Sequence, residues 1–314
     1  MTRYILRRLG LLLVTILLTS MLIFAITQLL PGDIARIILG REAGEQALEA
    51  LREQLGLNDP VIVQYGRWLV NLLKGDWGNS FSTDTEIFPL VMGRLRNSLM
   101  LTAMIFTLSI PLALFLGTIS GLNEEKPIDL LISMTSLSLV GLPEFVTGLI
   151  LIQVTAIDLG WFPANSSIPM QASFGEAFPM LILPALTATL VLLAYITRLT
   201  RAGVIEELKK PYVRTAMLKG LPRPSVIRRH VLRNALLPTI TVIAISFGWM
   251  ISGLIVIENV FNYPGLGRLV IFAIERRDLP LLQSVTMVTV VGYAISNLVA
   301  DLLYAKLNPK IRLE

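Results

Sequence analysis

The chain has 314 residues, of which 54% are apolar and only 16% are charged. A soluble domain carries about 25% charged residues, so this composition excludes an ordinary soluble protein and indicates several membrane spans. The absence of cysteine excludes disulfides and cysteine-based sites, and the net charge of +5 fits the cytoplasmic Lys/Arg excess of membrane proteins better than nucleic-acid binding.

Six stretches of the chain are apolar enough to cross a membrane as helices of about 20 residues. They are residues 9–30, 98–121, 128–156, 178–197, 239–257 and 281–303. The first follows Arg3, Arg7 and Arg8, but it is longer than a signal-peptide core and no A-x-A-like cleavage site follows it. We therefore expect a retained first span and predict an all-α protein with six transmembrane helices.

The segment between the first two spans, residues 31–97, is predicted to be an extracytoplasmic helical cap. Helical spacing of apolar residues predicts helices at 42–55, 61–73 and 84–96. The predicted organisation is thus residues 1–30 as N-terminal segment and first span, 31–97 as cap, and 98–314 as a five-helix core. The cap either packs on the spans as a lid or docks another protein, and its residues leave both roles open.

Two features are predicted inside the spans. Gly117 and Gly121 form a G-x-x-x-G pattern, which indicates close helix packing. Gly141 and Pro143 predict a bend in the third span, and Glu144 beside them is an acid well inside the apolar run. Glu144 and Pro143 are therefore candidates for the substrate pathway, although Glu144 could equally face a neighbouring helix or water at the bend.

Orientation follows from the distribution of Lys and Arg among the short loops. With the N-terminus inside, the inner segments hold 17 of these residues and the short outer segments hold three. Because cytoplasmic loops carry the excess of positive charge, both termini are predicted to be cytoplasmic.

The loop 198–238 is strongly basic, with ten Lys or Arg residues, and has helical signals of its own. Pro211 stands at a first helical position and Gly220 at the position after a helix end. Between them Tyr212 and Ala216, and likewise Val213 and Met217, are four residues apart. So short a helix is unstable alone in water and needs a partner surface, which is either lipid headgroups or a groove in a soluble subunit.

A second helix is predicted after Pro224, over residues 225–232, with its arginines on the polar side. Pro238 is predicted to mark the entry to the fifth span.

Segments distributed along the chain resemble the dipeptide, oligopeptide and nickel branch of ABC importer permeases. They are the opening MTRYILRRLG, LLPGD at 29–33, GDWGNS at 75–80, LGWFPA at 159–164, YVRTA at 212–216, KG at 219–220, RNALLP at 233–238, ENVF at 258–261, PGLG at 264–267, RDLP at 277–280 and NPKIR at 308–312. The glutamate of the general EAA core is replaced by Arg214 in this chain, and the gap from Gly220 to Pro238 is longer than in sugar permeases. Both departures resemble the peptide branch.

The resemblance implies a type I importer fold in the bacterial inner membrane and a function as half of the pathway for di- or oligopeptides. Nickel chelates, glutathione or sugars are alternative substrates. It also implies partners: a second homologous permease subunit, two ATPase subunits and an extracytoplasmic binding protein. The short loop helix would be the coupling helix that docks on an ATPase, through Tyr212, Val213, Arg214, Thr215, Ala216 and Gly220.

No G-x-x-x-x-G-K-[ST] phosphate-binding motif occurs in the chain, so ATP with Mg²⁺ is expected on the partner subunits and no cofactor on this one. An intramembrane enzyme is disfavoured because H-E-x-x-H and G-x-S-x-G are both absent and the single histidine, His230, lies in the basic loop. A secondary transporter remains a distant alternative, since Glu144 is a lone candidate for ion coupling.

Overall fold

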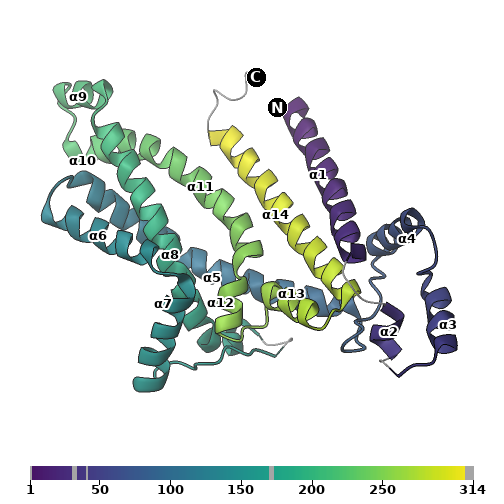
Figure 1. The fold of residues 1–314 in the computed structure, drawn as a ribbon. Helices are drawn as coiled ribbons and strands as arrows, with labels where there is room; N and C mark the ends of the chain where they lie inside the picture. The colour runs from purple at the N-terminus through teal and green to yellow at the C-terminus, as the bar shows by residue number, and fades with distance from the viewer. Residues whose placement is uncertain (1, 30–33, 40–41, 170–172, 308–314) are drawn as a thin grey trace.

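The structure, a computed structural model, describes residues 2–29, 34–39, 42–169 and 173–307 (Figure 1). Throughout these residues the regular elements are helices, and one isolated β-bridge joins Asn79 to Glu86. In chain order the helices are α1 Thr2–Leu29, α2 Ile34–Leu39, α3 Glu45–Leu55, α4 Val61–Lys74, α5 Ile87–Leu122, α6 Pro127–Gly141, α7 Glu144–Leu151, the π-helix η1 Ile152–Asp158, α8 Phe174–Leu208, α9 Pro211–Leu218, α10 Arg223–Val226, the π-helix η2 Ile227–Val231, α11 Leu232–Gly253, α12 Ile255–Val260, α13 Leu266–Glu275 and α14 Leu279–Leu307. The predicted motif residues 30–33 and 308–312 lie outside the described residues.

The prediction of an all-α protein with six spans is confirmed. Five of the described helices are long and apolar enough to cross a membrane, and the bent pair α6 and α7–η1 makes a sixth if it is one span. The helix direction bends by 101° between the two arms, and Pro143 directly precedes the second arm. The bend follows from the sequence. Proline disfavours the helical conformation of the residue before it, and proline itself suits the start of a helix.

Two predicted boundaries are wrong. The helix expected at 84–96 and the span expected at 98–121 are one helix, α5, because no residue breaks the helical pattern between them. Pro238 lies inside α11 instead of at the entry to the fifth span. The helical stretch there runs without a break from α10 through η2 into α11, and Pro224 lies in its first turn as expected.

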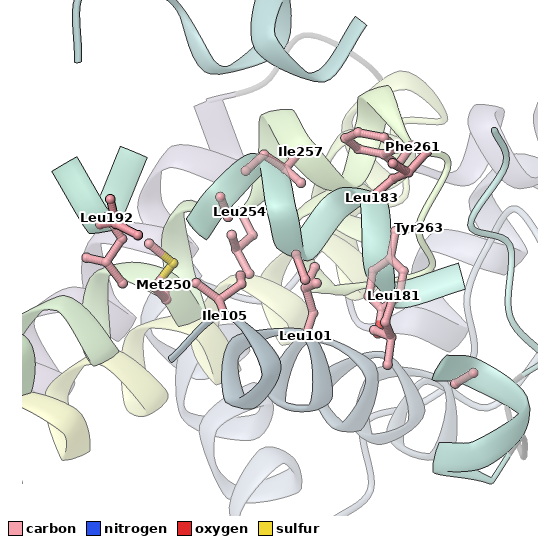
Figure 2. Packing of buried hydrophobic residues seen from close by; sticks show 14 of the residues in the cluster. Leu101, Ile105, Leu181, Leu183, Leu192, Met250, Leu254, Ile257, Phe261 and Tyr263 are labelled. Carbon is pink, nitrogen blue, oxygen red and sulfur yellow. The ribbon is translucent and has the colours of Figure 1, made fainter. Parts of the chain in front are cut away.

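The core forms where α5 and α8 pack together and α11–α12 cover them (Figure 2). Leu101 and Ile105 of α5 share one buried cluster with Leu181 and Leu192 of α8 and Met250 of α11. The G-x-x-x-G prediction is confirmed: a Cβ on Gly117 would stand 2.6 Å from the Thr197 carbonyl oxygen, and one on Gly121 would stand 2.7 Å from Val204 Cβ. Only glycine allows α5 and α8 to approach this closely.

A buried ion pair attaches α6 to this core. The carboxylate of Asp129 accepts two hydrogen bonds from the Arg201 guanidinium of α8, at 2.6 and 2.7 Å. It also accepts hydrogen bonds from Ser120 Oγ at the end of α5 and from the Glu125 backbone amide. The bidentate pair therefore fixes the end of α5 and the start of α6 to α8 at one point.

A second buried acid organises the opposite end of the bundle. Asp278 is fully buried just before α14 and accepts hydrogen bonds from Ser80 Oγ, Ser82 Oγ and the Ser82 amide. This acid links the loop after α4 to the start of the last span. At the edge of the molecule α1 packs along α14, with Gln283 donating to Thr27 Oγ1 and Arg8 paired with Asp301 at 2.6 Å.

Candidate functional site

The strongest candidate site is the short helix α9, which stands beyond the end of α8 on the side of the bundle where α1 begins and α14 ends (Figure 1). Pro211 occupies its first turn, as predicted. At its other end Gly220 has φ +79°, and the amides of Gly220 and Leu221 donate to the carbonyls of Met217 and Ala216. This pair of bonds is a Schellman motif, so the predicted glycine stop is confirmed.

One face of α9 packs on the chain itself. Val213 is buried against Val226 and Val231 of the α10–η2 segment, with Tyr212 and Ala216 at the margin of the same cluster. This tertiary support explains how a helix of eight residues is held, since helices this short are unstable by themselves.

A polar network fixes the junction between α8 and α9. Glu207, which is buried at the end of α8, accepts hydrogen bonds from Lys210 Nζ and Tyr212 Oη, and Asn234 Nδ2 of α11 donates to Tyr212 Oη at 3.3 Å. Burial and the Glu207 carboxylate raise the pKa of Tyr212, and the same carboxylate raises the pKa of Lys210. The tyrosine therefore stays a neutral donor and the lysine stays charged at physiological pH.

The other face of α9 is open. Arg214, Thr215 and Met217 are exposed there, and Leu218 exposes 79% of its surface. Arginines and His230 along the α10–η2–α11 stretch are exposed as well, at 223, 228, 229, 230 and 233. The arrangement is a rigid helix that presents a small apolar tip within a basic surrounding.

The structure divides the six residues singled out from the sequence. Arg214 and Thr215 point outward, whereas Tyr212, Val213 and Ala216 form the supporting face and Gly220 forms the stop. Val213 and Met217 are four residues apart and were expected on one stripe, but Val213 is buried and Met217 is exposed. Glu207 and Asn234 were missed, because only the fold brings them to Tyr212.

The other candidates, Pro143 and Glu144, lie at the bend between α6 and α7. Pro143 is exposed, and the Glu144 side chain is half-buried, with no hydrogen-bond or ion-pair partner among the described residues. Asp129, an acid of the same predicted span, was overlooked at the sequence level although it stands in an apolar run after Pro127. Unlike Glu144 it is fully engaged, so its role is structural.

Comparison with known proteins assigns the chain as a whole. The family described as "Binding-protein-dependent transport system inner membrane component" matches residues 109–313, and its N-terminal counterpart matches residues 1–102. The glutathione transport system permease proteins GsiC of Escherichia coli K12 and of Shigella dysenteriae are 35% identical to it over 312 residues. That of Salmonella paratyphi A is 34% identical, and each alignment covers 99% of both chains.

In this family of importers the permease depends on a separate ATPase subunit and on a substrate-binding protein. The helical architecture, the bent span and the resemblance of the ordered motifs agree with these matches. The chain thus belongs to the binding-protein-dependent transport system inner membrane components and is the inner-membrane permease subunit of an ABC importer.

Proposed function

We propose that the chain forms one half of the translocation pathway for short peptides, including glutathione-type peptides, and that α9 is the helix through which ATP hydrolysis is coupled to it. The single observation that carries the coupling role is the build of α9: one face is anchored by Val213, the other face is free, and Leu218 is exposed at its tip. The relatives named as glutathione permeases, and the sequence resemblance to peptide permeases, support the substrate class.

A lipid-headgroup role for α9 is less well supported by this geometry. An interfacial helix places a broad apolar face against lipid. The broad apolar face of α9 is instead occupied by Val226 and Val231, and the free face combines Arg214 and Thr215 with two apolar side chains. A small mixed surface of this kind suits a protein groove, where an anchor side chain enters a pocket.

The coupling role is tested by Gly220→Val in the complete transporter. An added Cβ at Gly220 meets nothing within 4 Å, so the substitution acts only through the positive φ, at a cost of about 1–2 kcal/mol to the helix end. We expect the ATPase subunits to dissociate more readily on purification, or ATP hydrolysis to continue without transport.

Gly160→Val is the matched control. Gly160 also has a positive φ, of 65°, with nothing within 4 Å of an added Cβ, but it lies in the loop before α8, at the end of α8 remote from α9. It should leave ATPase retention and coupling unchanged. Equal behaviour of the two variants, or full coupling in Gly220→Val, would refute the role of α9.

The proposed assembly contains a second homologous permease subunit, two ATPases and an extracytoplasmic binding protein. One six-span chain carries one α9, whereas an engine of two ATPases offers two docking clefts. Native mass spectrometry should therefore find this chain with a different permease and two ATPases. Two copies of this chain with no other permease would contradict the heterodimer, and mass spectrometry of the ligand carried by the binding protein would test the peptide substrate.

A further inference from the structure

Helix α4 belongs to the segment predicted as an extracytoplasmic cap, but its contacts place it beside a membrane span. Tyr65 Oη is hydrogen-bonded to Ser20 Oγ of α1 at 2.8 Å, and the rings of Tyr65 and Trp68 stand 5.6 and 5.7 Å from that of Phe24. Farther along, Gln28 donates to Gln64 at 3.1 Å. The contacts on α1 recur every fourth residue, so α4 lies against one face of the span.

These contacts also give the depth of α4. Ile26 and Leu29 are exposed apolar residues near the end of the span Ile5–Leu29. Ser20 precedes Ile26 by six residues, which is about 9 Å at a rise of about 1.5 Å per residue. The Tyr65 hydroxyl is therefore level with a part of α1 that lies inside the hydrocarbon, while Gln64 meets Gln28 near the end of the span, and Figure 1 shows α4 beside the end of α1.

The two sides of α4 differ in chemistry. Gln64, Arg67 and Asn71 follow one side of the helix, and Arg67 is paired there with Asp59 at 2.6 Å. A second side exposes the apolar side chains of Ile62, Val63, Val70 and Leu73, and Lys74 borders it in the last turn. Ile62 exposes 83% of its surface and Leu73 exposes 79%. Leaving such a side chain in water instead of an apolar medium costs about 1.5–3 kcal/mol, so this face calls for an apolar neighbour.

We propose that α4 is an amphipathic helix embedded in one leaflet, with Ile62, Val63, Val70 and Leu73 in contact with lipid acyl chains. The occupant is lipid because α4 packs on the membrane span α1 through Ser20 and Phe24, and α1 itself exposes apolar side chains such as Met21 and Leu22 at this depth. The helix has the features of an interfacial helix, including Tyr65 and Trp68, residue types typical of the membrane interface. In the proposed orientation this is the outer leaflet, and α4 anchors the cap there.

The cysteine-free chain allows a direct test. Single spin-labelled cysteines at Ile62 and Leu73 are compared, in the assembled transporter, with Leu22 of α1 as the lipid reference and Glu53 of α3 as the exposed polar reference. The transporter is reconstituted in vesicles of phosphatidylethanolamine and phosphatidylglycerol. Collisions with oxygen, which concentrates in hydrocarbon, and with a water-soluble nickel chelate are then measured by electron paramagnetic resonance.

We expect labels at 62 and 73 to be relaxed by oxygen several-fold more than by the nickel chelate, as at 22, and the reverse at 53. Strong relaxation by nickel at 62 and 73 would place the face in water and overturn the proposal. Weak relaxation by both reagents would show that another protein chain covers the face, and this too would overturn it. Because all four side chains are partly or fully exposed, the labels should not disturb packing, which co-purification of the partner subunits verifies.

Discussion

At the scale of single residues, Glu258 is a second buried acid outside the spans, besides Asp278. It is 1% exposed; Oε1 accepts a hydrogen bond from Ser98 Oγ at 2.6 Å, and Oε2 accepts one from the Arg268 amide at 3.0 Å. The carboxyl thereby caps the N-terminus of α13 from α12. A Cβ on Gly265 would stand 2.0 Å from Oε1, which explains the glycine beside it.

Burial raises the pKa of Glu258 from its ordinary value of 4.5 to about 7. Between these values the folded chain keeps a proton that the unfolded chain has lost, so stability falls as pH rises through this window and levels off above it. Glu258→Gln keeps the shape but cannot titrate, so it should remove a loss of stability on the order of 3 kcal/mol across the window. Thermal unfolding of the purified protein at pH values through this range measures it.

Glu275→Gln, at an exposed acid of α13, is the control for Glu258 and should leave the pH dependence as in the parent protein. An unchanged slope in Glu258→Gln would show that another group controls it.

Gly117 gives a second prediction at this scale. In Gly117→Ala the new Cβ would stand 2.5 Å from Thr200 Cβ, so α5 and α8 must separate, at a cost of about 1–3 kcal/mol. Gly10→Ala in α1, where nothing lies within 4 Å, should be neutral or slightly stabilising because alanine favours helix. The measurement is the midpoint of thermal unfolding, and equal midpoints for the two variants would contradict the close-packing interpretation.

At the scale of elements, two ion pairs connect the α5–α6 region to α8 but differ in burial. Asp129 is 4% exposed in its pair with Arg201, whereas Glu124 and Lys209 are 38% and 65% exposed. Asp129→Asn should cost about 1–3 kcal/mol, a value reduced for the partial exposure of Arg201, because it leaves a guanidinium without its carboxylate. Glu124→Gln should change stability by less than about 1 kcal/mol.

Chemical denaturation of the two variants side by side decides this prediction. A loss in Asp129→Asn no larger than that in Glu124→Gln would mean that the buried pair does not hold α6 to α8. The comparison is well matched because both substitutions remove one negative charge near the same turn.

The π-helices and the bent span show how elements are joined in this fold. η1 ends the second arm of the bend, and η2 joins α10 to α11, so each lies where a helix changes its surroundings. Within the helical stretch from α10 to α11, Pro238 is accommodated without a helix end. Proline by itself therefore did not determine the boundary, because in membrane-spanning helices neighbouring helices and side chains can satisfy the backbone groups that proline leaves without a partner.

At the scale of the whole molecule, the orientation in the membrane is the central prediction. Leu218 at the tip of α9 and Ser167 in the loop before α8 are both exposed, and the chain contains no cysteine of its own. A cysteine at Leu218, like one at Thr2, should react with an impermeant reagent only from the cytoplasmic side. A cysteine at Ser167 should react only from outside.

Labelling of intact cells before and after permeabilisation measures both. Reaction at Leu218 in intact cells would reverse the orientation and, with it, the assignment of α9 to the ATPase side. One end of the bundle holds α9, the start of α1 and the end of α14 (Figure 1). The prediction that Leu218 is cytoplasmic and the prediction that Thr2 is cytoplasmic therefore hold or fail together.

Hydropathy alone determined the number of spans, because a helix that crosses lipid must be apolar along about 20 consecutive residues. Local signals likewise determined α9, since Pro211 and Gly220 act on the backbone at their own positions. The bend at Pro143 and the tight contact at Gly117 were also readable from the chain, for the same reason.

Only the tertiary structure decided which residues act together. Glu207 meets Tyr212, Asp129 meets Arg201 and Ser98 meets Glu258, the last two across 72 and 160 positions of sequence. It also decided that α4 lies beside α1, although its apolar stripe was visible in the sequence. Periodicity reports the chemistry of a helix face, whereas the neighbour of that face depends on how distant segments pack, which no local pattern encodes.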